Sequence, residues 1–347
     1  MEGQEEKDKR ASEEDQDIMR QQANSTEPIK HLIVTVKANN TVSALSSIAH
    51  RLTPDSSILF LQNGMGIIDE VDRDIFPDPD TRPNYMQGII SHGVRNSGRN
   101  LWEAVHSGFG SIQLGLLPRH SSATDSSLKD NYPETSSYLL KTLLRAPVLA
   151  AVPLSPTELL QAQLEKLAIN AVINPMTSLL DGRNGLVLYN FYLTRVIRLL
   201  VAEISLVLRS LPELQHLPNL STRFSPERLE TLTLGVAAKT SENISSMLAD
   251  VRRGRETEIE YINGYIVRRG EELGIKCVMN YLVENLVRGK TMAVSQETRS
   301  FIPIILKKGL RDMDEGEQAA AMGEDVDAED QQMQQDGDII NGEPKRA

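Results

Sequence analysis

Three polar side chains recur at every fourth position of an otherwise apolar stretch, residues 166–175. Lys166, Asn170 and Asn174 are spaced i, i+4 and i+8, so on an α-helix they line one face. The residues between them are Leu, Ala, Ile and Val, which indicates a buried helix. Burying an ammonium and two carboxamides is costly unless a polar group meets them, and a small polar ligand is the simplest such group. The structural alternative is a lysine with its stem along the core and its head in water, beside two capping amides.

Two more polar groups follow predicted strands in the first part of the chain. Lys37 and Asn39 lie at the end of the first strand, and Gln62, Asn63 and Gly64 follow the second. Ligands of open α/β sheets bind outside the carboxyl ends of the strands, so both turns are candidate binding sites. Glycine lets the backbone approach a ligand closely, and the Asn63 amide offers a donor and an acceptor. The structural alternatives are an ordinary Asn-Gly turn and a solvated strand end.

A fourth polar group lies in two neighbouring predicted helices. Asn243, Ser246 and Asp250 fall near one face of the first helix. Glu258 or Glu260, near the start of the second, could pair with a buried lysine and lower the cost of burying either charge. The alternative is an ion pair on the protein surface.

The elements that must position these groups divide into two kinds. Up to about Pro153, short β-branched runs alternate with amphipathic segments, which favours an α/β domain with helices on the sheet faces. The predicted strands are residues 31–37, 57–61, 86–91 and 147–152, with a β-ribbon at 93–117; the predicted helices are 41–52, one led by Ile67, Ile68 and Val71, and 138–144.

From Ser155 onward the pattern is helical. Ser155, Pro156 and Glu158 form a good helix start, and that helix runs into the row of polar residues. The further predicted helices are residues 188–211, 227–252, 256–273, 278–289 and 296–307, with a proline-containing loop at 212–226. We therefore expect an α/β domain at residues 30–153 and an all-α domain at residues 154–311.

The residues between the two ends of the chain, here called the body, differ from those ends in charge. Residues 1–29 carry 9 acids and 4 bases, and residues 312–347 carry 12 acids and 2 bases, so the body holds a net charge of +4 within a chain of −11. Both ends are poor in large apolar residues, and we expect disordered tails there. We also expect a mobile polar insert at residues 119–133. A mildly positive body permits an anionic small molecule and argues against nucleic acid as the main partner.

Cysteine content and hydropathy bear on the compartment. Cys277 is the one cysteine, which fits a reducing compartment, and its apolar neighbours indicate a core thiol rather than a nucleophile. No apolar run reaches the length of a membrane span, and the acidic N-terminus is unlike a secretory signal. We expect a cytoplasmic protein with no membrane association. A mitochondrial location stays an alternative that no sequence feature supports.

The four polar groups together resemble one family, ketopantoate reductase (2-dehydropantoate 2-reductase). The matching strings are LQNGMG at residues 61–66, KLAINAVINPMT at 166–177, ENISSMLAD at 242–250 and TEIEYING at 257–264. Their order and gaps also agree with the family, and the resemblance covers roughly residues 31 to 307.

The resemblance implies a fold, a reaction and a role for each matched residue. The fold would be a Rossmann-like NADP-binding domain followed by a helical domain similar to that of 6-phosphogluconate dehydrogenase. The reaction would be the reduction of 2-dehydropantoate to pantoate with NADPH, on the route to pantothenate and coenzyme A. The implied roles are Lys166 as general acid, Glu258 as the acid that orients it, Asn170, Asn174, Asn243 and Ser246 as substrate-binding residues, and Lys37 and Asn63 as residues on the cofactor side.

The sequence departs from the family pattern at the cofactor. The family begins with a strand, a G-x-G-x-x-G/A loop and a helix, which together cradle the pyrophosphate. Gly3 is the only glycine before Gly64, so no such loop precedes Lys37. We therefore expect the first half of the dinucleotide-binding domain to be absent and a hydrophobic sheet edge to be left at residues 32–36. A truncated gene model, a fragment completed by another chain and a protein that has given up catalysis are the three explanations; the intact polar residues of the helical domain favour truncation.

Two other functions stay open beside the reductase. One is a non-catalytic binding or regulatory protein that keeps the helical domain as a scaffold, and NADPH binding would distinguish it from the enzyme. The other is a reductase of a different 2-keto acid. Apolar stripes on helices 188–211 and 227–252 could also support a homodimer.

Overall fold

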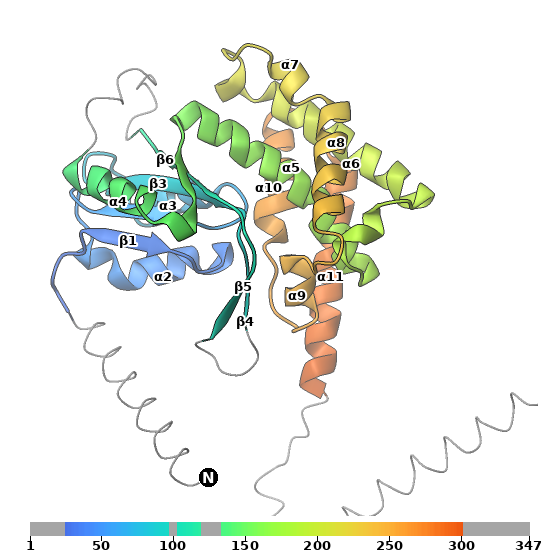
Figure 1. Ribbon diagram of the computed structural model, residues 1–347, viewed down its shortest axis with the longest axis horizontal. Helices are drawn as coiled ribbons and strands as arrows, with labels where there is room; N and C mark the ends of the chain where they lie inside the picture. Colours follow the sequence, from blue (N-terminus) through green and yellow to red (C-terminus); the bar gives the residue numbers. More distant parts are fainter. Residues whose placement is uncertain (1–24, 97–102, 119–132, 301–347) are drawn as a thin grey trace, which may run out of the picture. The chain divides into compact units, whose positions relative to one another are not determined.

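The computed structural model describes residues 25–96, 103–118 and 133–300. The tails and the insert expected at 1–29, 312–347 and 119–133 lie outside these ranges, apart from residues 25–29 and 133. Residues 97–102 of the expected ribbon and 301–307 of the last expected helix also lie outside them. Within the described ranges an α/β part is followed by a helical part (Figure 1), as the sequence predicts.

The main sheet has five strands in the order β1-β2-β3-β6-β7. These are β1 (His31–Val34), β2 (Ser57–Phe60), β3 (Asn84–Ile90), β6 (Ile112–Leu116) and β7 (Ala151–Pro153). The first three strands are parallel, β6 runs antiparallel to β3, and β7 is parallel to β6. The carboxyl ends of β1, β2 and β3 therefore meet at one edge of the sheet, where the two predicted polar turns also lie.

Among the described residues, strand β1 lies at the edge of the sheet and pairs with β2 alone. The prediction of a buried strand at residues 31–37 is wrong in part, because Ile33 is 44% exposed and Val36 is 40% exposed. A strand with a neighbour on one side leaves part of its surface uncovered. The hydrophobic sheet edge predicted at residues 32–36 is present at residues 32–34 only, because β1 ends at Val34.

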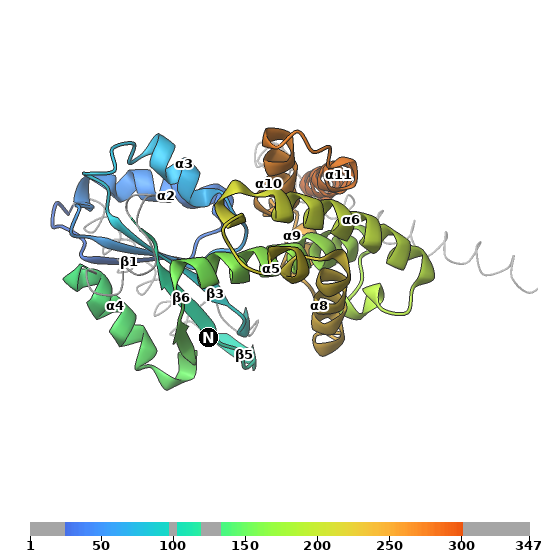
Figure 2. The ribbon, with the colours of Figure 1, turned by 90° about the horizontal axis from the view of Figure 1, so that it is seen from above.

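Helices cover both faces of this sheet (Figures 1 and 2). Helices α2 (Thr41–Ile48) and α3 (Ile67–Asp74) bury Leu45 and Val71 against β1 and β2. Helix α4 (Glu134–Leu144) buries Leu139 on the other face. Every residue of β2 is buried, as its unbroken apolar sequence predicts for a strand covered on both faces.

The connection after β3 differs from the predicted ribbon. Strands β4 (Gly93–Asn96) and β5 (Ala104–Gly108) form a separate two-stranded sheet, while β6 joins the main sheet. The strand predicted at residues 147–152 starts later than expected, at the first residue of β7. Pro147 instead starts a 3-10 helix, η3 (Pro147–Leu149), which is followed by Ala150 with a φ of 43°.

Helix α5 (Pro156–Leu180) connects the two parts of the molecule. The predicted helix start at Ser155 is confirmed, and the structure shows a capping box there, in which Ser155 and Glu158 satisfy each other's backbone groups. Its first turns pack on β6, where Leu159 lies so close to Gly115 that a Cβ there would be 2.8 Å from it. Its later turns form the centre of the helical core.

A proline lies inside α5 without ending it. Pro175 has no N–H, so the carbonyl of Ala171 loses its usual donor within the helix. The amide of Asn263, which is fully buried, donates to Ala171 O at 2.9 Å and to Asn280 Oδ1 at 3.0 Å. A neighbouring helix therefore satisfies the carbonyl that the proline leaves free.

The remaining helices pack around α5. They are α6 (Phe191–Ser210), α8 (Pro226–Lys239), α9 (Ser246–Val251), α10 (Ile259–Glu272) and α11 (Val278–Ser300), with short turns η4 (Asn184–Val187), η5 (Pro212–Leu214) and α7 (Leu220–Arg223). The 212–226 segment predicted as a loop thus contains two short helical turns, and its last proline is the first residue of α8.

Two other helix predictions are wrong in their limits. The helix predicted at 227–252 is broken, because Gly185 and Asn184 donate to the carbonyls of Ser241 and Asn243 and so use the backbone between α8 and α9. The predicted break after residue 289 does not occur. Lys290 donates to the carbonyls of Ser178 and Leu179, which anchors α11 beyond that point.

The apolar stripes expected to support a dimer are present on one helix only. On α6, Leu199 and Leu206 are exposed, whereas no large apolar side chain of α8 is exposed. The homodimer stays a prediction.

Cys277 is buried, and burial raises the pKa of its thiol to about 11, which confirms a core thiol.

Asn263→Leu tests the support that α5 receives at its proline. The substitution leaves the buried Ala171 carbonyl and the Asn280 amide oxygen without their donor, so the free energy of unfolding should fall by about 2–4 kcal/mol. Chemical denaturation measures it. Asn285→Leu, at an exposed position of α11, is the control and should change stability by less than about 0.5 kcal/mol. Equal losses in the two variants would contradict the role of Asn263.

Candidate functional site

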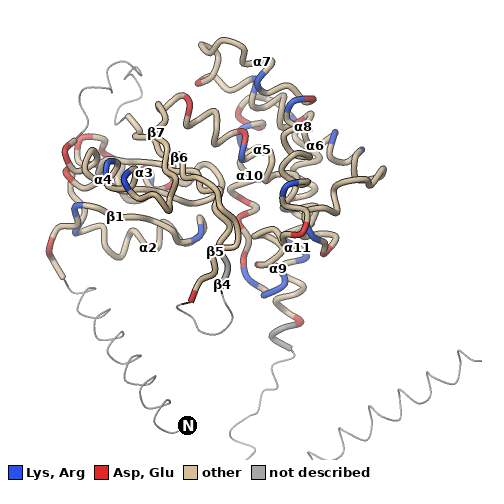
Figure 3. Tube along the Cα trace, viewed as in Figure 1, with Lys and Arg blue, Asp and Glu red and all other residues tan. Residues whose placement is uncertain are grey.

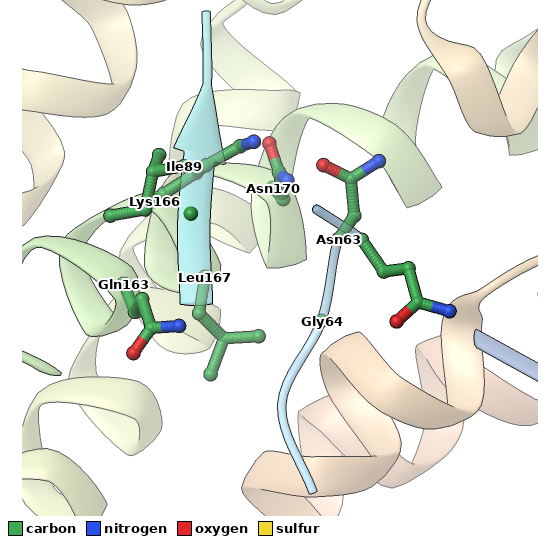
Figure 4. A pocket seen from close by; sticks show the side chains of 9 residues that line it. Asn63, Gly64, Ile89, Gln163, Lys166, Leu167 and Asn170 are labelled. Carbon is green, nitrogen blue, oxygen red and sulfur yellow. The ribbon is translucent and has the colours of Figure 1, made fainter. Parts of the chain in front are cut away.

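A cleft lies where the turn after β2 faces helix α5 (Figure 4). It encloses about 300 Å³ of unfilled space, part of which is open to solvent. Three segments line it: Gln62, Asn63 and Gly64 from the turn; Gly88 and Ile89 from β3; and Gln163, Lys166, Leu167 and Asn170 from α5. Most of these residues are polar, which suits a small polar ligand.

Lys166 is the cation of this cleft. Its Nζ donates to the carbonyl oxygen of Ile90 at 2.9 Å. Burial lowers its pKa to about 8, although the nearby negative charge of Glu258 acts in the opposite direction. The Lys166 ammonium therefore gives up its proton far more readily than a lysine in water. That property suits a general acid that must release and regain a proton near neutral pH.

The carboxylate of Glu258 is held by two donors rather than by an ion pair with Lys166. It accepts a hydrogen bond from the backbone N–H of Ala38 at 3.2 Å and from the Asn63 amide at 3.3 Å. Glu258 takes the N-cap position of α10, so the start of that helix faces the carboxyl ends of β1 and β2. Glu260, the alternative partner for the lysine, instead faces Arg268 and Arg288.

The turn after β2 needs its glycines. Gly64 has a φ of 85° and Gly66 a φ of 90°, values that favour glycine. A Cβ on Gly64 would lie 2.5 Å from the Cβ of Tyr261. Met65 N also donates to Tyr261 O at 2.8 Å. The turn is therefore packed directly on α10, which fixes the position from which Asn63 enters the cleft.

The structure brings together only some of the predicted site residues. Lys166, Asn170 and Asn63 line the cleft, and Glu258 joins them through Asn63. In Figure 4 the amides of Asn63 and Asn170 and the end of Lys166 are directed toward the same end of the cavity. Of the three residues predicted to form a row on α5, Lys166 and Asn170 therefore line the cleft together.

The other four predicted residues do not line the cleft. The ammonium of Lys37 forms an ion pair with Asp250 and donates to the carbonyl of Glu256. Asn174 is 7% exposed and lies one turn beyond Asn170 on α5.

Asn243 precedes α9 instead of sharing a helix face with Ser246, and both side chains are exposed. Ser245, the residue before Ser246, caps α9 by accepting from Leu248 N at 3.1 Å.

Sequence reasoning missed Gln163 and Gly88 among the lining residues, whereas Gln62 lies in the candidate turn after β2. Gln163 could have been found, because it continues the polar row one turn toward the start of α5. Nothing in the sequence marks Gly88, whose missing side chain makes room for Leu61 and Leu114. The pairing of Lys37 with Asp250 joins positions 213 residues apart and has no local signal.

Within residues 25–96, 103–118 and 133–300, no group of three or more His, Cys, Asp or Glu residues could hold a metal ion. Among the helices of these same ranges, none has both the length and the apolar character needed to span a membrane.

Comparison with known proteins places the chain in a family. Residues 2–119 match the family model "Ketopantoate reductase PanE/ApbA", and residues 158–291 match "Ketopantoate reductase PanE/ApbA C terminal". The first match begins well before residue 31, where the resemblance was expected to begin. A probable 2-dehydropantoate 2-reductase of Schizosaccharomyces pombe is 31% identical over 268 residues, which cover 77% of this chain and 75% of the relative.

Solved structures share the fold. A probable 2-dehydropantoate 2-reductase from Bacillus subtilis superposes with a TM-score of 0.56 at 27% identity, covering 75% of this chain and 77% of that protein. A D-mandelate dehydrogenase solved with NADH and anilino(oxo)acetate has a TM-score of 0.61 at 19% identity, with coverages of 79% and 80%, and is similar in fold alone. With both family models matched and a relative nearly one third identical over three quarters of its length, this chain belongs to the ketopantoate reductase family.

Proposed function

We propose that this protein reduces 2-dehydropantoate to (R)-pantoate with NADPH. The observation that carries the proposal is the cleft that places a lysine of lowered pKa among the amides of Asn63 and Asn170. The relatives support the substrate, since those most similar in sequence are named 2-dehydropantoate 2-reductase. We also propose that residues 30–153 form the cofactor domain and residues 154–311 the substrate domain.

The described residues fit the nicotinamide end of such a cofactor. The Asn63 amide stands at the carboxyl end of β2 and lines the same cleft as Lys166, so these two residues would hold the nicotinamide and the substrate close together. The described residues do not supply a comparable site for the pyrophosphate. Among the described residues, the turn after β1 has no glycine, and Gly64 after β2 is covered by Tyr261. We therefore assign no residue to the phosphates.

In the proposed reaction, Lys166 and its neighbours handle the substrate oxygen. A bound nicotinamide would supply the hydride to the keto carbon. The Lys166 ammonium donates a hydrogen bond to the keto oxygen, stabilises the negative charge that grows on it, and transfers its proton to complete the hydroxyl group. Asn170 holds the substrate from the next turn of α5.

Glu258 supports this step through charge. Its carboxylate opposes the effect of burial on Lys166 and keeps more of that lysine protonated at neutral pH. Asn63 ties the same carboxylate to the cleft. The proposed roles of Asn174, Asn243 and Ser246 at the substrate, and of Lys37 at the cofactor, rest on the family resemblance alone.

A non-catalytic scaffold is the second candidate. It is favoured by the described turn after β1, which has no glycine to bring backbone donors close to a dinucleotide. A scaffold has no need of NADPH, whereas the enzyme requires it. A reductase of another 2-keto acid would share every step above and differ only in the alkyl group it accepts.

Lys166→Ala tests the general acid. Turnover of 2-dehydropantoate should fall about 10²–10⁴-fold because no other described cation lines the cleft, while NADPH affinity measured by calorimetry should change little. Lys141→Ala, at an exposed position of α4, is the control and should keep full activity. A folded wild-type chain that binds no NADPH would favour the scaffold, and a fully active Lys166→Ala would refute the assigned acid.

The pH dependence of kcat/KM tests the protonation state of Lys166. Reduction needs the ammonium form, so the rate should decline above a pH of about 8 instead of near the ordinary lysine value of 10.5. In Glu258→Gln the charge that raises the pKa of Lys166 is gone, so the decline should start at lower pH. A decline at unchanged or higher pH in this variant would show that Glu258 does not act on Lys166.

A further inference from the structure

The turn after β1 is attached to the helical part by four contacts. Lys37 pairs with Asp250, and its Nζ also donates to Glu256 O at 3.3 Å. The Asn39 amide donates to the Glu256 carboxylate at 2.7 Å, and Ala38 N donates to Glu258 at 3.2 Å. All four acceptors lie between the end of α9 and the start of α10, where acidic and basic residues follow one another closely (Figure 3).

The pair of Lys37 and Asp250 is the ion pair of this group. The Asp250 side chain is 11% exposed and that of Lys37 is 33% exposed. The main chain of Asp250 also closes the turn after α9, because its carbonyl accepts from Arg253 N and Arg255 N at 3.0 Å each. A half-buried pair in a fixed turn is a firm anchor, since removing one partner leaves the other charge poorly solvated.

This anchor leads directly to the cleft. Lys37 and Ala38 are neighbours in the chain, and the Ala38 N–H is one of the two donors that hold the Glu258 carboxylate. The other donor is Asn63, which lines the cleft. A shift of the turn would remove the Ala38 donor and leave Glu258 held by one side chain.

We propose that Asp250 is a positioning residue of the active site. By holding Lys37, it keeps the Ala38 N–H on the Glu258 carboxylate and so keeps that carboxylate beside Asn63 and Lys166. Glu256, which binds Asn39, is a second anchor of the same turn. This inference rests on the proposed function for its kinetic consequences, while the contacts themselves do not depend on it.

Asp250→Asn in the full chain tests the proposal by kinetics. The amide keeps the size of the side chain and removes its charge, so kcat should fall about 10-fold or more while KM for the 2-keto acid stays within about threefold. The decline of kcat/KM at high pH should also move to lower pH, because Glu258 no longer stays beside Lys166. A purely structural role would lower the active fraction without moving the pH profile.

Asp181→Asn is a matched control. Asp181 pairs with Arg252, two residues from Asp250, at 2.7 Å, and its side chain is 57% exposed. This control should leave kcat, KM and the pH profile unchanged, and thermal unfolding should show that both variants are folded.

Hydrogen exchange of the Ala38 amide provides a readout without catalysis. In wild type the Glu258 carboxylate protects this amide, and in Asp250→Asn its exchange should become about 10-fold faster or more, whereas Asp181→Asn should not change it. A wild type without turnover but with this exchange pattern would refute the proposed function and keep the anchor.

Three results would overturn the positioning role. One is an unchanged exchange rate in Asp250→Asn, and another is an unchanged kcat with an unchanged pH profile. The third is a change confined to KM for NADPH, which would mean that Asp250 acts by occupying a cofactor-binding lysine.

Discussion

Helix α5 is the constraint on which both the fold and the cleft depend. Its first turns lie against β6, where Gly115 permits close approach, and its later turns form the centre of the helical core. One rigid element thus carries Lys166 and Asn170 from the core to the edge of the sheet. The proline inside this helix is tolerated because Asn263 supplies the missing donor. The interior of the helical part therefore sets the geometry of the cleft.

Electrostatics at the cleft depends on a balance between burial and one carboxylate. Burial pushes Lys166 toward its neutral form, and Glu258 opposes that effect. Glu258 is itself fixed by donors from two turns of the sheet, Ala38 and Asn63. The start of α10 thus joins the ends of β1 and β2 to the lysine on α5. A displacement of Glu258 would change its effect on the pKa of Lys166.

The family places this chain among oxidoreductases, and the described residues support the substrate side of such a site better than the cofactor side. The cleft has a polar lining that includes the ammonium of Lys166. The described turn after β1 has no glycine, and Gly64 in the turn after β2 is covered by Tyr261. The two ligands need different groups. A pyrophosphate needs exposed backbone N–H donors, whereas a keto acid can be bound by polar side chains such as those on α5.

Sequence alone determined the elements whose signals lie within a few neighbouring residues. The buried strand β2 and the row formed by Lys166 and Asn170 follow from hydrophobic periodicity, and the start of α5 follows from Ser155, Pro156 and Glu158. Tertiary contacts decided the rest. The helix is broken before α9 because the backbone N–H groups of residues 184 and 185 donate to carbonyls in that segment. The Lys37 ammonium pairs with Asp250 instead of lining the cleft. Periodicity describes one helix or strand at a time, so it cannot show which distant partner satisfies a backbone group or a charge.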